Sequence, residues 1–231
     1  MFIEIENAVK KYGKGEAEVF ALDGASLSVE EGKIYVILGP SGSGKSTLLN
    51  LLGGLDSPDS GSITLNGREI SGLDKNKLTE YRRKEIGFVF QFYNLIPDLT
   101  VEENIEIVAD IADAPLSVDE VLEALELSKY RYRFPKELSG GQQQRVAITR
   151  ALVKNPRVLL CDELTGALDS KSSRSVLQFI RKVNEKFGTT ILIITHNEAI
   201  AGMADAIVRI KDGKVASVSG NERLAVSGLE L

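Results

Sequence analysis

A glycine-rich loop joins a buried-strand pattern to a helix pattern near the start of the chain. The run Lys33–Leu38 is short, apolar and β-branched, as expected of a strand covered on both faces in a parallel sheet. The loop Gly39–Ser46 follows at once with the spacing G-x-x-x-x-G-K-S, and a helical pattern begins at Lys45. Main-chain N–H groups of such a loop curve around phosphate oxygens, and the helix start adds its positive end. The spacing therefore predicts a nucleoside-triphosphate site rather than a flexible Gly/Ser turn.

Main-chain and side-chain groups of this loop have different expected tasks. Lys45 is placed to reach the β- and γ-phosphates, and the Ser46 hydroxyl is placed to hold Mg²⁺. The expected nucleotide-binding residues here are Gly39, Pro40, Ser41, Gly42, Ser43, Gly44, Lys45, Ser46 and Thr47.

Two adjacent carboxylates end another apolar strand pattern, Val158–Cys161. In open α/β folds ligands sit at the carboxyl edge of the sheet, where both side chains emerge. Asp162 is the predicted Mg²⁺ holder, and Glu163 is the predicted general base that takes a proton from water. The alternative is a solvated acidic pair that opens a loop, and the phosphate loop makes it the poorer explanation.

The pentapeptide Leu138–Gln142, with the sequence Leu-Ser-Gly-Gly-Gln, lies between these two motifs. A helical pattern follows it, so Ser139 and Gly141 are expected at a helix amino terminus with N–H groups available to an anion. A simple helix start explains Ser139 but not the adjacent glycines, which lower helix stability. The pattern favours an anion-binding helix terminus.

The remaining pattern is that of one α/β domain, 1–231, without a visible linker or repeat. Apolar strands alternate with helices, which predicts a mostly parallel core sheet. Two hairpin signals, Asn66-Gly67 and Asp212-Gly213, predict an antiparallel accessory sheet. The predicted strands are 86–90, 158–161 and 190–194, the predicted helices are 118–127 and 172–185, and the first helix is expected to bury Leu48, Leu49, Leu51, Leu52 and Leu55.

Composition restricts the location and the partners. The formal net charge of −5 argues against broad nucleic-acid binding, and none is expected. The single cysteine, Cys161, cannot form an intrachain disulfide, and the first residues show neither a basic start nor a long apolar run. Apolar runs such as 34–38 fall far short of the roughly 20 residues that cross a bilayer. We expect a cytoplasmic chain that reaches a membrane only through a partner.

The ordered motifs resemble those of ATP-binding-cassette (ABC) ATPases over nearly the whole chain, and 90–100 is most similar to the macrolide-export, lipoprotein-release and antimicrobial-peptide-resistance group. The resemblance implies a P-loop NTPase fold, with a mostly parallel core sheet, an antiparallel β accessory sheet and an inserted helical subdomain at about 92–137. It also implies ATP hydrolysis with Mg²⁺ by two copies that sandwich ATP head to tail. In that dimer Ser139, Gly140, Gly141 and Gln142 would cap the γ-phosphate bound by the opposite copy.

Several roles rest on the resemblance alone. Gln91 matches a glutamine that touches Mg²⁺ and water, and His196 matches the histidine that holds the γ-phosphate or the attacking water. Tyr12 matches an aromatic residue that stacks on adenine, and 167–169 matches the loop that links the two sites. Without the resemblance the alternatives are a polar residue at a strand end, a capping or core histidine and an ordinary exposed tyrosine.

The chain departs from the family pattern in the strand and loop that carry Glu163. Leu164 stands where the family usually has proline, and we expect this change to loosen the loop. Cys161 replaces a more usual small apolar residue and is expected to be a buried packing thiol.

The resemblance implies an ATPase subunit that drives a separate integral membrane permease with a large external domain, by export or mechanotransmission. The chain would then lie peripherally on the inner face of the cell membrane. The predicted docking cluster is Gln91, Phe92, Tyr93, Asn94, Leu95 and Ile96, unless these residues pack the helical subdomain onto the core. The alternative function is a soluble cassette protein acting on ribosomes or DNA, a class that usually carries two cassettes or a long coiled-coil insertion.

Overall fold

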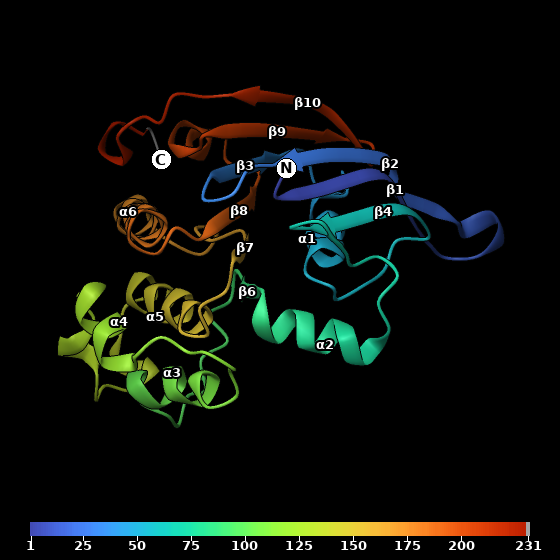
Figure 1. The fold of residues 1–231 in the computed structure, drawn as a ribbon. Coiled ribbons are helices and arrows are strands. Elements are labelled where there is room, and N and C mark those ends of the chain that lie inside the picture. Colours follow the sequence, from blue (N-terminus) through green and yellow to red (C-terminus); the bar gives the residue numbers. More distant parts are fainter. Residues whose placement is uncertain (230–231) are drawn as a thin grey trace.

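The computed structural model describes residues 1–229, so the last two residues of the expected 1–231 domain lie outside it. In this described part of the chain, a six-stranded sheet forms the centre (Figure 1). Its strands in spatial order are β10 (Lys214–Gly220), β9 (Ala206–Lys211), β3 (Ile34–Leu38), β8 (Thr190–Thr195), β7 (Val158–Asp162) and β6 (Ile86–Val89). All neighbours are parallel except β10, which runs antiparallel to β9. The predicted parallel core is confirmed.

A second, antiparallel sheet contains β2 (Val19–Val29), β1 (Ile3–Tyr12), β4 (Ser60–Leu65) and β5 (Arg68–Glu69). The Asn66-Gly67 turn joins β4 to β5 as predicted. The assignment of the Asp212-Gly213 hairpin to this sheet is wrong. That turn joins β9 to β10, and β9 pairs with β3, so the hairpin extends the core sheet. The physical reason is that Val208 and Ile210 are fully buried and belong beside the core strand.

Within residues 1–229, six α-helices connect and cover the sheets, together with short 3-10 turns. They are α1 (Lys45–Leu52), α2 (Lys75–Lys84), α3 (Val101–Ala109), α4 (Val118–Ala124), α5 (Gly140–Leu152) and α6 (Ser170–Phe187). The 3-10 turns are Gly15–Ala17, Ser128–Tyr130, Pro135–Glu137, Glu198–Met203 and Val226–Gly228. Side chains fix several helix starts: Asp74 caps α2, Asp169 caps α6, and Thr100 forms a capping box with Glu103 at α3.

The core sheet is buried on both faces. In β3, Ile34 and Val36 belong to one apolar cluster and Tyr35 and Ile37 to the other, as the twofold alternation of a strand requires. The first cluster reaches α3, α4, α5 and α6, and the second contains α1 and the accessory sheet. The prediction that Leu55 is buried is wrong. Helix α1 ends at Leu52 and the chain turns at Gly53-Gly54, so Leu55 is 51% exposed.

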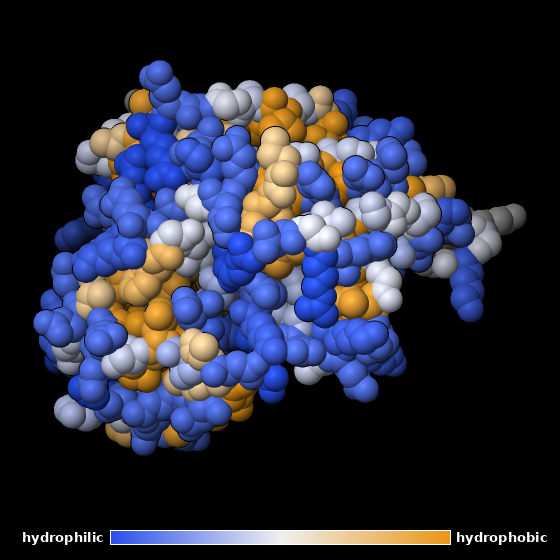
Figure 2. Space-filling view, viewed as in Figure 1, coloured by the Kyte–Doolittle hydropathy of each residue, from blue (hydrophilic) through white to orange (hydrophobic). Residues whose placement is uncertain are grey.

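Helices α3 and α4 lie within the predicted helical segment 92–137 and pack beside α5, away from the accessory sheet (Figure 1). Hydrophilic side chains cover most of the face seen in Figure 2, with hydrophobic ones gathered over the α4 and α5 region at the lower left. Among the described helices, none combines the length and the hydrophobicity that a membrane span requires.

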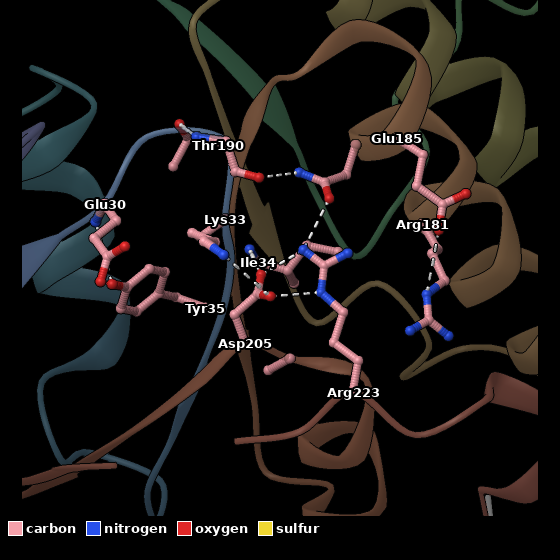
Figure 3. A network of polar contacts seen from close by, with 12 residues as sticks. Glu30, Lys33, Ile34, Tyr35, Arg181, Glu185, Thr190, Asp205 and Arg223 are labelled. Atoms are coloured by element: carbon pink, nitrogen blue, oxygen red, sulfur yellow. Dashed lines mark hydrogen bonds and ion pairs between the residues drawn. The ribbon is translucent and has the colours of Figure 1, made fainter. Parts of the chain in front are cut away.

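A polar network ties the amino ends of the core strands to the chain that follows β10 (Figure 3). Asp205 Oδ2 accepts a hydrogen bond from the N–H of Ile34 at 2.7 Å, and Asp205 Oδ1 accepts one from Arg223 Nε at 2.7 Å. Arg223 also donates to Asn184 Oδ1 at 3.0 Å. Asn184, near the end of α6, donates in turn to Gly32 O at 2.8 Å. Both charged side chains of the Asp205–Arg223 pair are only 20% exposed, so this pair is well shielded from water.

We predict that Asp205→Asn lowers the free energy of unfolding by about 1–3 kcal/mol at pH 7, because it weakens a shielded ion pair. Burial acts to raise the pKa of Asp205, but the bonds from Arg223 and the Ile34 N–H outweigh it and lower that pKa. The stabilisation is therefore complete above the unfolded pKa of about 4 and is lost as pH falls through the lower folded pKa. Urea unfolding at pH 7 and at about pH 3 measures the difference.

The matched control is Glu31→Gln, which removes the more exposed pair with Arg157 and should change stability by less than about 0.5 kcal/mol. An Asp205→Asn protein as stable as the wild type at pH 7, or a stability gap that persists undiminished in acid, would contradict the role given to this network.

Candidate nucleotide-binding site

The loop Gly39–Ser46 takes a backbone path that needs glycine at two points. Gly44 precedes α1 with φ of 103°, and a Cβ there would lie 2.3 Å from the carbonyl oxygen of Ala21. A Cβ on Gly39 would lie 2.3 Å from the carbonyl oxygen of Ile210. Both positions therefore exclude larger residues on steric grounds. The loop is packed directly against β2 and β9.

Lys45 is buried and begins α1. Its Nζ donates to Gly39 O at 2.7 Å and to Pro40 O at 2.9 Å, so the ammonium group lies inside the curve of the loop. Ser43 is also buried, and its Oγ has no hydrogen-bond partner within the described chain. A cationic group held by two carbonyl oxygens is suited to bind phosphate, because phosphate oxygens are stronger acceptors than neutral carbonyls.

The β9–β10 hairpin supports this loop from behind. The Gly213 N–H donates to Ser43 O at 3.1 Å, and Gly213 O accepts from the Asp23 N–H at 2.9 Å. The turn that sequence reasoning assigned to the accessory sheet thus links β2 to the phosphate loop.

Asp162 and Glu163 leave the carboxyl end of β7 as predicted, next to the end of β8. Thr195 Oγ1 donates to Glu163 Oε2 at 3.1 Å, and His196 Nδ1 lies 2.9 Å from Glu163 Oε1. Glu163 has φ of 47°, an uncommon conformation for a residue other than glycine. The parallel register of β7 and β8 sets Asp162 opposite Ile194, which brings the two strand ends together. The predicted base and the predicted histidine are therefore neighbours.

Asp162 is half-buried, and its environment is suited to a cation. Burial raises the pKa of the Asp162 carboxyl, the charge of Glu163 raises it further, and Lys45 acts against both. A divalent cation would stabilise the ionised form. No group of three or more His, Cys, Asp or Glu side chains forms a metal cage within residues 1–229. Mg²⁺ commonly binds one or two protein groups together with substrate phosphates, so Asp162 with the exposed Ser46 fits this ion.

Gln91 lies against the loop that follows Glu163. Its Nε2 is 2.8 Å from the position that a Cβ on Gly166 would take. Helix α5 holds the adjoining chain: Arg150 donates to Asn94 O at 2.7 Å and to Tyr93 O at 3.2 Å. Gln144, completely buried, donates to Phe90 O at 3.3 Å. Sequence reasoning missed Arg150 and Gln144, although polar side chains among the apolar positions of α5 were a signal.

The predicted docking cluster is only partly exposed. Phe92 is 71% exposed and Ile96 is 38% exposed. Leu95 packs on the core cluster, and the Tyr93 hydroxyl is 2.6 Å from the position that a Cβ on Gly140 would take. Tyr93 and Leu95 are partly buried and make the packing contacts that the alternative requires, whereas Phe92 and Ile96 keep the exposure that docking requires. The docking site stays a prediction.

Ser139 caps α5 as expected of a helix start. Its Oγ accepts from the Gln142 N–H at 3.4 Å, and its own N–H donates to Gln142 Oε1 at 2.8 Å. Gly141 is buried, with the Ser172 Cβ 3.1 Å from where its own Cβ would stand. The groove beside the phosphate loop is lined by residues of β1, β2, the loop and α1, and within the described chain by none of 138–142. Within one chain, the predicted phosphate-binding segment 138–142 therefore lies outside the groove beside the phosphate loop.

Tyr12 is 45% exposed and lines that same groove, together with Phe20, Gly42 and Thr47. Leu164 is 2% exposed and belongs to the core cluster, so its side chain is buried, and the loosening of the loop expected from the lack of proline stays a prediction. Cys161 is fully buried as predicted, and burial raises the pKa of its thiol.

Comparisons with known proteins agree with the motifs and with the fold. A family model described as ABC transporter matches residues 22–166. The chain is 44% identical over 222 residues to the uncharacterised ABC transporter ATP-binding protein MJ0796 of Methanocaldococcus jannaschii, covering 92% of this chain and 94% of that one. A dimeric structure of that cassette, in a post-hydrolysis state bound to ADP and Pi, has a TM-score of 0.83 and covers 96% of this chain and 100% of the other.

Two longer relatives match as well. A putative ABC transporter ATP-binding protein of Mycoplasma genitalium is 44% identical over 222 residues, which is 95% of this chain and 48% of the relative. The macrolide export ATP-binding/permease protein MacB of Hyphomonas neptunium is 45% identical over 228 residues, which is 96% of this chain and 35% of the relative. The chain therefore spans half or less of the length of these two curated relatives.

We predict that Glu163→Gln lowers ATP turnover by at least about 100-fold, because the amide keeps the side-chain shape but cannot accept a proton from water. ATP binding, measured by calorimetry, should stay within about threefold of the wild-type value, because the amide removes a negative charge near the phosphates without removing a phosphate contact. Near-normal steady-state turnover in the variant would exclude Glu163 as the base. Glu198→Gln, on the same edge but paired with Arg209, is the control and should leave turnover unchanged.

Proposed function

The chain belongs to the ABC transporter family, and from this membership we propose that it is an ATP-hydrolysing nucleotide-binding subunit whose head-to-tail dimer drives a membrane permease. The observation that carries the proposal is that Lys45, Asp162, Glu163 and His196 meet at one edge of the core sheet. The capped start of α5 lies outside the groove beside the phosphate loop, which Lys45 lines. One chain supplies the hydrolytic half of a site and the cap of another.

The cis half would act on the terminal phosphate. The loop N–H groups and Lys45 bind the triphosphate, while Ser46, Asp162 and Gln91 would hold Mg²⁺, which neutralises charge on the β- and γ-phosphates when bound. Glu163 accepts a proton from water as the water oxygen bonds to the γ-phosphorus and the bond to the β-phosphate oxygen breaks. His196, 2.9 Å from Glu163, is placed to orient the same water or the phosphate.

The trans half would come from a second copy. The residues that close on the γ-phosphate are Ser139, Gly140, Gly141 and Gln142, at the amino terminus of the 13-residue helix α5. Their separation from the groove of their own chain supports this arrangement, as does the dimeric structure of the M. jannaschii cassette. Adenine would stack on Tyr12, and the loop 167–169 would connect the two sites. We treat 1–231 as one cassette with a helical subdomain at about 92–137.

The permease would dock at the exposed part of the segment after β6. Phe92 and Ile96 are exposed there, next to main chain that α5 holds through Arg150. The macrolide export relative, described as an ATP-binding/permease protein, supports a membrane partner of that type. We propose that the partner carries a large external domain and holds this chain on the inner face of the cell membrane.

Two substitutions separate the two halves of the site. Lys45→Ala removes the phosphate-binding charge and should abolish ATP binding, since no other lysine or arginine lines the groove among residues 1–229. Ser139→Arg blocks the cap, so the protein should bind ATP as a monomer but neither dimerise nor hydrolyse it. Calorimetry, size-exclusion chromatography with ATP and steady-state turnover measure the three properties.

The shared site also predicts that turnover per wild-type chain rises with protein concentration, because each site needs two chains.

The control for Ser139→Arg is Asn76→Arg, at an exposed residue of α2. It adds the same positive charge away from the cap and should behave as the wild type. Normal hydrolysis by Ser139→Arg, or constant activity per chain from nanomolar to tens of micromolar protein in a monomer, would contradict the shared site.

We predict that Phe92→Glu abolishes co-purification with a co-expressed permease while ATP binding and the unfolding temperature stay unchanged, because this side chain is exposed and would meet an apolar surface. Tyr93→Glu should instead damage folding as well, since the Tyr93 hydroxyl packs against Gly140. Leu55→Glu, a change at another exposed apolar residue, is the control that should still assemble. A folded Phe92→Glu protein that assembles normally would place the docking surface elsewhere.

A further inference from the structure

We propose that Asp56 is a positioning residue for the nucleotide base, because its carboxylate fixes the ring of Tyr12 at the rim of the groove beside the phosphate loop. The inference rests on the proposed function, in which the base stacks on Tyr12. It adds a residue outside the motifs, four positions after the end of α1.

The Tyr12 ring is exposed, but its hydroxyl is held. Tyr12 Oη donates to Asp56 Oδ2 at 2.9 Å. Asp56 Oδ1 in turn accepts from Lys10 Nζ at 2.7 Å and from the Ser57 N–H at 2.8 Å. Lys10 Nζ also donates to Ser57 O at 2.8 Å. Because Lys10 and Tyr12 are both on β1, the carboxylate connects that strand to the turn after α1 at two points.

The charges strengthen this arrangement. The Lys10 side chain is only 12% exposed and that of Asp56 is 32% exposed, so water screens the pair less than a surface pair. Burial acts to raise the pKa of Asp56, but the bonds from Lys10, Ser57 and Tyr12 outweigh it and the pKa is lowered. Burial and the bond to Asp56 raise the pKa of Tyr12, so its hydroxyl stays protonated and donates. Such a charge-assisted bond is stronger than a neutral one.

Helix α1 connects this anchor to the phosphates. It begins at Lys45, runs for 8 residues, about 12 Å, and ends at Leu52. Its exit turn is tied back to the helix, because the N–H groups of Leu55 and Asp56 donate to Asn50 O at 2.9 and 3.4 Å. The helix that starts at the phosphate-binding lysine therefore carries the anchor of the base-stacking ring, which sets the spacing between the two ends of the nucleotide.

A ring that is already fixed loses little conformational freedom when a base stacks on it, so the anchor should increase affinity. The base is remote from the reacting phosphate and is bound alike before and during the reaction. Loss of the anchor should then raise Kd and KM without lowering kcat.

The experiment compares ATP with inorganic tripolyphosphate, which lacks the base, by calorimetry with Mg²⁺ in a Glu163→Gln background that prevents hydrolysis. Asp56→Ala should weaken ATP binding by about 10-fold and leave tripolyphosphate binding within about twofold. In the otherwise wild-type chain it should raise KM with kcat within about twofold. Glu18→Gln removes an exposed ion pair with Lys11 on the same hairpin and is the matched control, with ATP affinity unchanged.

A double-mutant cycle isolates the positioning role. In a Tyr12→Ala protein, Asp56→Ala should cause no further loss of ATP affinity, because no ring remains to position. Tyr12→Phe removes only the hydroxyl and should weaken ATP binding by about fivefold, which keeps the test available if Asp56→Ala does not fold. Wild-type ATP affinity in these variants, an equal loss of tripolyphosphate binding, or additive losses in the cycle would overturn the inference. A wild-type chain that binds no ATP would instead refute the proposed function.

Discussion

Burial of the core sheet on both faces is the constraint on which the rest of the structure depends. Strands β3, β7 and β8 place successive apolar side chains alternately into two clusters, so a charged side chain could not emerge from their middle without a large desolvation cost. The chemistry is therefore confined to the strand ends. Because these strands are parallel neighbours, their ends meet at one edge, and residues that are 32 or 33 positions apart in the chain come into contact there.

Helix α5 has two structural roles at once. Its amino terminus presents the Ser139 cap, whereas Gln144 and Arg150 farther along hold the main chain of the segment after β6. The contact between the Tyr93 hydroxyl and Gly140 adds a third connection. These contacts attach the main chain on both sides of the exposed Phe92 to α5.

Two sets of contacts from residues outside the motifs support the phosphate loop and helix α1. The β9–β10 hairpin bonds to Ser43, and the Asp56 carboxylate connects β1 to the far end of α1. The hairpin connects β2 to the phosphate loop through Gly213, and Asp56 connects β1 to the helix that follows this loop. The accessory sheet therefore supports the loop and α1 as well as covering α1. On the opposite side, the Asp205–Arg223 network fixes the amino ends of the core strands (Figure 3).

The sequence by itself determined the parallel α/β core, the phosphate loop, the carboxylates after β7 and the helix start at Ser139, because each depends on residues that are adjacent in the chain and on local backbone geometry. Tertiary structure alone decided that the Asp212-Gly213 hairpin extends the core sheet, that Leu55 is exposed and that the Tyr93 hydroxyl lies against Gly140. It also decided that Arg150 bonds to Asn94, 56 residues away in the chain, and that Asp56 bonds to Tyr12, 44 residues away. The physical reason is that a polar side chain gains most from the acceptor or charge that folding brings beside it, and spacing along the chain does not specify that neighbour.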